Sequence, residues 1–158
     1  LAAEISRDFA GKHPLLVGVL TGAVVFLSDL IRLLTIPYEV DFISASSYDT
    51  EAVSSGSVRL LKDLSIDPEG RHLLLVEDIV DTGLTLQRMM EILRSRGPSS
   101  VKVCVLLDKK PRRLVPLTLD YVGFEVPDEF LVGYGLDYAR RYRGLPFVAV
   151  LKRSVYGG

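Results

Sequence analysis

The sequence predicts an α/β fold in which parallel strands alternate with helices. Three apolar runs lack the polar alternation of half-exposed strands, so they predict strands buried on both faces: LLVGVL (15–20), HLLLV (72–76) and VKVCVLL (101–107). Segments with apolar residues at helical spacing follow the first two runs. A strand, a helix and a second apolar strand in this order are typical of parallel βαβ units.

The first half of the chain predicts one strand–helix pair and then a hairpin. A turn after the strand at 15–20 leads into a helix over 23–34. Residues 38–46 are rich in β-branched and aromatic residues and predict a strand, to which 58–64 returns as a second arm. Between them, residues 47–57 are polar and small, and long for a connection in a compact domain. Such loops are usually lids or disordered segments.

The second half repeats the pattern and then becomes less regular. A helix with one apolar face begins near Leu84 after the strand at 72–76 and ends at Gly97-Pro98. The strand at 101–107 follows. We expect three further short strands, near 120–126, 130–134 and 147–152.

Composition favours a single soluble domain over residues 1–158. A net charge of −1 argues against a nucleic-acid-binding surface, which needs a basic excess. The single Cys104 cannot form a disulfide within the chain, which favours a reducing, cytoplasmic location. The longest apolar stretch, 14–27, is too short and too broken by glycine to span a bilayer. Because the chain begins at Leu1 rather than Met, we expect that N-terminal residues are missing.

An acidic turn follows the strand at 72–76. Glu77, Asp78 and Asp81 repel one another, and a stable fold does not require them there. If the strands are parallel, this turn lies at the edge of the sheet where ligands bind. The sequence DTGLT (81–85) adds backbone N–H groups, a glycine and two hydroxyls, which together suit a phosphate. Neighbouring carboxylates would then bind ribose hydroxyls or a metal.

Three other interpretations are a helix cap or a receiver domain for the acidic turn, and a nucleotide-binding loop at residues 18–22. Each fits the sequence less well than a phosphate site does. A cap accounts for Asp81 or Thr82 but not for the acidic pair before them. The segment GVLTG (18–22) matches neither GxGxxG nor a P-loop. LLLVEDIVD resembles the first strand of a response-regulator receiver domain, but residues 79–158 are too few for the rest of one.

The segment VEDIVDTGLT (76–85) closely resembles the phosphoribosyl-pyrophosphate motif of type I phosphoribosyltransferases. An Asp at position 81 is typical of the hypoxanthine-guanine branch of that family. The resemblance extends over nearly the whole chain, through ISASSY (43–48), LLDKKPRR (106–113) and residues 120–148. It implies a central, mostly parallel sheet flanked by helices, with a flexible lid loop over about 47–57 and a small C-terminal hood.

The resemblance implies roles in binding the phosphoribosyl group. Glu77 and Asp78 would face the ribose hydroxyls, directly or through Mg²⁺. Asp81 would also accept a proton from N7 of the purine. The 5′-phosphate would lie in the turn formed by Asp81, Thr82, Gly83, Leu84 and Thr85.

For the purine, the resemblance implies that Lys109 donates to the 6-oxo group, Phe130 stacks on the base, and the Leu131 backbone meets its Watson–Crick edge. Asp137, beside the purine, would hold a second Mg²⁺ on pyrophosphate, and Arg143 would contact pyrophosphate. Taken alone, Lys109 reads as one charge of a solvated basic run, and Phe130 and Leu131 as core. Asp137 and Arg143 could equally belong to a solvated helical face.

Two loops complete the implied site. Leu20, Thr21 and Gly22 align with the pyrophosphate loop of the family, in which a cis peptide often precedes the second residue. That residue is Thr21 here, whereas many relatives have Lys or Arg, so only a backbone role is expected. Ser47 and Tyr48 match the Ser-Tyr pair at the base of the family's lid, whose closure would protect an oxocarbenium-like centre from water.

The implied reaction is transfer of the 5-phosphoribosyl group from phosphoribosyl pyrophosphate to N9 of hypoxanthine or guanine, with Mg²⁺, in purine salvage. The products are IMP or GMP and pyrophosphate. A homo-oligomer, dimer or tetramer, is also implied, with no membrane or nucleic-acid partner. The alternative is a non-catalytic regulator of the same fold that senses nucleotides and binds nucleic acid. Retention of Asp81, Lys109 and Asp137 weighs against it.

Overall fold

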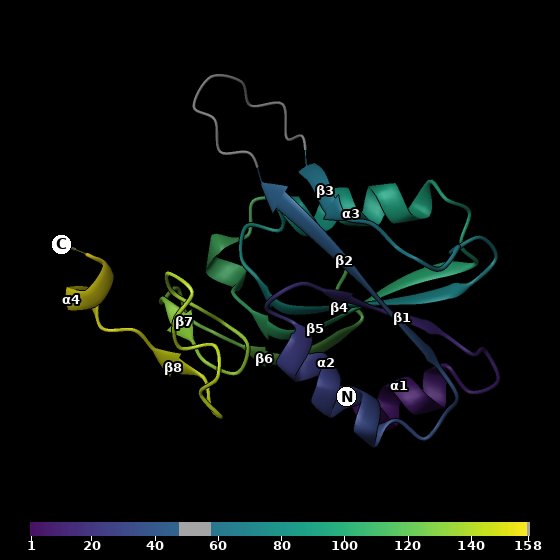
Figure 1. Cartoon of the computed structure of the whole chain (residues 1–158), viewed down its shortest axis with the longest axis horizontal. Helices are drawn as coiled ribbons and strands as arrows, with labels where there is room; N and C mark the ends of the chain where they lie inside the picture. The colour runs from purple at the N-terminus through teal and green to yellow at the C-terminus, as the bar shows by residue number, and fades with distance from the viewer. Residues whose placement is uncertain (48–57, 158) are drawn as a thin grey trace.

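A six-stranded sheet forms the centre of the computed structural model, which describes residues 1–47 and 58–157 (Figure 1). Its strand order is β3-β2-β1-β4-β5-β6, and all neighbours are parallel except β3, which pairs antiparallel with β2. The α/β class and the mostly parallel sheet are therefore confirmed. The strands are β1 (Leu15–Val19), β2 (Glu39–Ser47), β3 (Val58–Lys62), β4 (His72–Val80), β5 (Ser100–Asp108) and β6 (Tyr121–Glu125).

Helices cover the two faces of this sheet, α1 (Ala2–Asp8) and α2 (Val24–Leu33) on one side and α3 (Leu84–Arg94) on the other (Figure 1). Successive residues of a strand point to opposite faces. Leu74 therefore packs with Ile5 and Phe26 beneath α1 and α2, whereas Leu75 packs with Met89 beneath α3. Because both faces are covered, β1 is buried along its whole length, as its unbroken apolar sequence predicts.

The C-terminal segment 127–157, which we call the hood, lies beside the sheet (Figure 1). It contains β7 (Leu131–Val132) paired antiparallel with β8 (Ala149–Val150), followed by the short helix α4 (Arg153–Tyr156). Between the two strands the backbone turns through several left-handed residues, among them Tyr134, Ala139 and Arg140. This part of the chain is ordered by tertiary contacts rather than by long regular elements.

The structure changes several predicted boundaries. β4 continues to Val80, because Ile79 and Val80 pair with Leu107 and Asp108 of β5. Glu77 and Asp78 therefore belong to the strand itself and do not follow it. The helix α1, the 3₁₀ turn η1 (Lys110–Arg112) and α4 are elements that the sequence pattern did not indicate. Within residues 1–47 and 58–157, no helix has the length and apolar character needed to cross a membrane.

Candidate active site

The turn between β4 and α3 builds a small hollow of about 140 Å³. Gly83, the N-cap residue before α3, has a φ of 86°, and a Cβ there would lie 2.7 Å from Leu117 and 2.9 Å from Arg113. A side chain at this position would be both strained and crowded. The hollow is lined by Glu77, Ile79, Val80, Asp81, Thr82, Gly83, Thr85 and Leu86. Its size and its place at the start of a helix suit a phosphate group.

Leu84, also predicted to hold the phosphate, is not part of the lining. Its side chain is half exposed, and its backbone N–H points to Thr82 Oγ1 at 3.5 Å. Only the backbone of Leu84 is therefore suited to phosphate binding.

The acidic pair at the end of β4 divides between two environments, as alternation along a strand requires. Glu77 lines the small hollow, while the buried Asp78 accepts a hydrogen bond from the N–H of Ile79 at 2.9 Å. Burial, and then the neighbouring Asp78 carboxylate, raise the pKa of Glu77 well above its ordinary value. Two carboxylates in this position favour a cation or hydroxyl donors as their missing partner.

The loop after β1 packs directly against Asp78. The Leu20–Thr21 peptide is cis, a feature that the resemblance left open for this chain, and Leu20 donates from its backbone N–H to the carbonyl of Ile43 at 2.8 Å. A Cβ on Gly22 would lie 1.8 Å from Asp78 Oδ2, so only glycine fits. The Thr21 side chain is exposed. The structure thus brings the predicted pyrophosphate loop to the end of β4.

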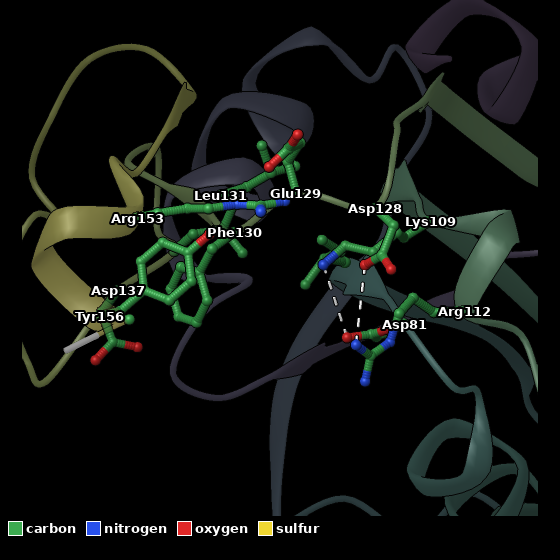
Figure 2. Close-up of a pocket in the computed structure, with 13 residues that line it drawn as sticks. Asp81, Lys109, Arg112, Asp128, Glu129, Phe130, Leu131, Asp137, Arg153 and Tyr156 are labelled. Atoms are coloured by element: carbon green, nitrogen blue, oxygen red, sulfur yellow. Dashed lines mark ion pairs between the residues drawn. The ribbon is translucent and has the colours of Figure 1, made fainter.

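A larger cavity, of about 700 Å³, separates the sheet from the hood (Figure 2). Asp81, Lys109 and Arg112 lie on the sheet side, which we call the sheet wall. Lys109 Nζ is 3.7 Å from Asp81 Oδ2, and Arg112 Nε is 3.2 Å from Asp81 Oδ1. Nevertheless Asp81 Oδ1 is shielded from solvent and accepts no hydrogen bond from any described residue. A shielded acceptor of this kind normally has a donor partner.

Lys109 is held deep in this wall, with only 10% of its side chain exposed. Its backbone N–H donates to the carbonyl of Val80 at 3.0 Å, which ties the end of β5 to the end of β4. It is therefore not a solvated member of the basic run, as it would be if read in isolation.

Arg113 and Asp108 support the sheet wall from behind. They form a buried ion pair, and Arg113 Nε also donates to the carbonyl of Asp81 at 3.3 Å. The N–H of Leu114 donates to the carbonyl of Thr82 at 3.0 Å. Asp108, Arg112 and Arg113 were not predicted as site residues, because in the sequence they belong to one run of charged residues with nothing to distinguish them.

The opposite side of the cavity, the hood wall, contains Phe130, Leu131, Asp137 and Tyr156 (Figure 2). Leu131 is buried, and the ring of Phe130 is 36% exposed. Phe130 directly precedes β7, and its carbonyl accepts a hydrogen bond from the N–H of Leu151 at 2.7 Å, so its backbone is anchored while its ring lies at the cavity. The predicted purine-binding residues therefore face one another across a single cavity, with Lys109 on one wall and Phe130 on the other.

Asp137 and Arg143 form an ion pair, with Arg143 Nη2 2.9 Å from Asp137 Oδ1. Asp137 lines the cavity and Arg143 does not. Arg143 also donates to the carbonyl of Gly135, and a Cβ on Gly135 would lie 2.1 Å from the carbonyl oxygen of Gly22. The hood therefore touches the loop after β1. Residues 137–143 contain no helix: they form turns around an isolated bridge between Tyr138 and Arg141.

The predicted lid and the predicted Mg²⁺ site are described only in part by the structure. Ser47 is the last residue of β2, whereas Tyr48 and the rest of the lid lie outside the described residues. In the described ranges there is no cluster of three or more His, Cys, Asp or Glu residues that could enclose a metal. Mg²⁺ usually binds one or two carboxylates together with substrate phosphates. The hard oxygens of Glu77, Asp78 and Asp137 fit that mode, although they form no cage by themselves.

Comparison with known proteins agrees with this geometry. A model of the phosphoribosyl transferase domain matches residues 1–139. The hypoxanthine-guanine phosphoribosyltransferase of Bacillus subtilis is 49% identical over 156 residues, which are 99% of this chain and 87% of that protein.

Solved structures give the same result. A hypoxanthine phosphoribosyltransferase from Staphylococcus aureus matches with a TM-score of 0.95 and 42% identity, over 99% of this chain and 85% of that one. A hypoxanthine-guanine phosphoribosyltransferase from Bacillus anthracis matches with a TM-score of 0.91 and 47% identity, over 96% of this chain and 89% of that one. The chain therefore belongs to the type I phosphoribosyltransferase family, in its hypoxanthine-guanine branch.

Proposed function

We propose that the chain transfers the 5-phosphoribosyl group of phosphoribosyl pyrophosphate to N9 of hypoxanthine or guanine, releasing pyrophosphate and forming IMP or GMP. The observation that carries this proposal is the Asp81 carboxylate at a cavity faced by Phe130: its shielded Oδ1 accepts no hydrogen bond from a described residue and has Arg112 as ion-pair partner, while Lys109 lies 3.7 Å from its Oδ2. An acceptor and a donor on one wall and a ring on the other match a planar 6-oxopurine. The nucleic-acid-binding regulator is not favoured, because the relatives are named as transferases.

In this mechanism the small hollow at 81–85 binds the 5′-phosphate through backbone N–H groups and threonine hydroxyls. Asp81 accepts the proton that the purine loses from N7 as its N9 attacks C1′. Lys109 donates to the 6-oxo group, and Phe130 stacks on the base. Leu131 meets the Watson–Crick edge of the base through its backbone.

The pyrophosphate would lie between the backbone of Leu20, Thr21 and Gly22 and the guanidinium of Arg143. Glu77, Asp78 and Asp137 supply carboxylate oxygens for Mg²⁺, which when bound would neutralise charge on the pyrophosphate. Ser47 and Tyr48 would form the base of the lid.

We further propose a cytoplasmic homo-oligomer, a dimer or a tetramer. Sedimentation of the purified protein measures the oligomeric state, and a monomer at all concentrations would contradict this part of the proposal.

Cys104 is buried, and burial raises the pKa of its thiol to about 12, so it is unreactive. This supports a packing role for the chain's one cysteine.

Initial rates with hypoxanthine, guanine, xanthine and adenine, at fixed phosphoribosyl pyrophosphate and Mg²⁺, test the reaction. Adenine carries an amino group at C6, so it would place a hydrogen-bond donor against Lys109, which is itself only a donor. Sites that hydrogen-bond a substrate group reject an analogue lacking it by roughly 10⁴–10⁵. We expect high activity with hypoxanthine and guanine and almost none with adenine. A catalytic efficiency for adenine within about tenfold of that for hypoxanthine would overturn the assignment.

A further inference from the structure

The C-terminal tail is attached to the part of the hood that faces the cavity. Val150 pairs with Leu131 in the small sheet, and the N–H of Leu151 donates to the carbonyl of Phe130 at 2.7 Å. The side chain of Leu151 is buried. The tail therefore holds the backbone of Phe130 and Leu131 in place immediately before it forms α4.

The ring of Phe130 is held by two tyrosine rings. Tyr156, in α4, lies with its ring centroid 5.0 Å from that of Phe130 and its plane tilted by 33°. Tyr138 meets Phe130 edge-on, at 5.4 Å and 90°, and its hydroxyl donates to the carbonyl of Val155 at 3.4 Å. Tyr156 and Tyr138 therefore contact the ring of Phe130 at two different angles. Such aromatic contacts have preferred geometries and orient the rings that make them.

Tyr156 also reaches the cavity directly, together with Arg153 and Gly157 (Figure 2). A four-residue helix is not stable by itself in water, so contacts of this kind keep α4 in place. The hollow proposed for the 5′-phosphate has no residue of α4 in its lining. Thus α4 borders the cavity assigned to the base and does not border the hollow assigned to the 5′-phosphate.

We propose that Tyr156 is a positioning residue for the purine: it orients the ring of Phe130 and completes the hood wall of the base site. This rests on the proposed function, because it takes the cavity as the purine site. It assigns to the C-terminal helix a role in affinity for the base alone. The hydroxyl of Tyr156 is not required for this role, since the ring makes the contact.

Steady-state kinetics of Tyr156→Ala and Tyr156→Phe separate this role from a general effect on folding. We expect Tyr156→Ala to raise the KM for hypoxanthine about three- to tenfold, the amount that one lost aromatic contact corresponds to. The kcat and the KM for phosphoribosyl pyrophosphate should stay within about twofold. Tyr156→Phe should restore the parent values. Phe124→Ala removes a ring that is exposed on β6, outside the cavity, and serves as the matched control.

A binding measurement gives a readout that does not need turnover. The chain contains no tryptophan, so Tyr156→Trp introduces a single tryptophan into the hood wall, which can be excited selectively over the tyrosines. We expect a saturable change in its emission on titration with IMP, and no change for the control Phe124→Trp. This titration remains informative if the protein shows no transferase activity, so failure of the proposed function and failure of this inference are distinguishable.

Three results would overturn the inference. One is an unchanged KM for hypoxanthine in Tyr156→Ala. A second is an equal rise in the KM of both substrates without rescue by Tyr156→Phe, which indicates a structural role only. The third is an emission of Tyr156→Trp that does not respond to IMP while the parent protein binds it.

Discussion

The two walls of the large cavity are built in different ways. The sheet wall carries charges, Asp81, Lys109 and Arg112, and stands on the paired ends of β4 and β5. The hood wall carries the rings of Phe130 and Tyr156 as well as charged side chains such as Asp137, and stands on two-residue strands and left-handed turns. Charged groups that donate or accept hydrogen bonds need rigid support, because a hydrogen bond weakens steeply when its partners are misaligned. Stacking on an aromatic ring tolerates different bases better than a hydrogen bond does, since every base has a flat face.

This difference divides the work of the site between its walls. Variants of the sheet wall should change turnover and the choice of base. Variants of the rings on the hood wall should change affinity for all bases together. The following experiments test that division, beginning with the largest expected effect.

Asp81→Asn keeps the shape of the side chain and removes its ability to accept a proton. General acid–base catalysis contributes about 10²–10⁴ in rate, so kcat should fall on that scale with little change in either KM. Single-turnover rates with hypoxanthine measure the effect, and Asp67→Asn, in a surface turn, is the matched control. A loss below about threefold would remove Asp81 from the chemistry.

Lys109→Ala should lower catalytic efficiency for hypoxanthine by about a hundredfold and narrow the gap to adenine, because a charged hydrogen bond is worth about 1.5–3 kcal/mol. Lys110→Ala is the control. Lys110 is the next residue, but its side chain is exposed and paired with Glu125. If both variants behave alike, Lys109 acts only through the overall charge of the cluster.

Asp78→Ala should raise the KM for phosphoribosyl pyrophosphate about tenfold or more, on the same scale of charged hydrogen bonds. The backbone hydrogen bond that Asp78 accepts comes from its neighbour Ile79 and ties no distant element to the strand, so the melting temperature should change little. Kinetics and thermal unfolding are measured on the same preparation, with Glu125→Ala as control. A collapse in melting temperature with an unchanged KM would make the acidic pair structural.

Phe130→Ala should weaken the binding of hypoxanthine, guanine and a 6-amino analogue by a similar factor, about three- to tenfold, because stacking does not distinguish the substituent at C6. The ratio of efficiencies among the bases should remain that of the parent. A changed ratio would show that the hood wall takes part in selection, and the division between the walls would then be wrong.

The same contrast between sheet and hood accounts for what sequence reasoning could predict. The strands β1, β4 and β5 are covered on both faces, so their apolar runs were visible without any tertiary information. The extension of β4 to Val80 could not be predicted in this way, because it depends on the pairing of Ile79 and Val80 with β5. In the hood, short strands were predicted at 130–134 and 147–152, but each pairs over only two residues.

For the site, the acidic motif located Glu77, Asp78 and Asp81 directly, and the family resemblance placed Lys109 and Phe130. Neither indicated that Arg112 lies against Asp81 or that Arg113 pairs with Asp108. Those contacts depend on how η1 folds back over the β4–α3 turn. Charge runs in a sequence do not reveal which member turns inward. Tyr156 was missed for a related reason, because a single aromatic near the end of a chain has no periodic context.

The packing of Gly22 bears on how this site tolerates change over evolution. Three segments distant in sequence meet there through Gly22, Asp78 and Gly135, with no space for one added methyl group. Substitution of Gly22 or Gly135 is therefore not tolerated, because any larger residue displaces a neighbour that itself belongs to the site. The exposed side chain of Thr21 is under no such restriction. The loop is defined by its main chain, so a threonine can replace the basic residue of many relatives while the loop keeps its shape.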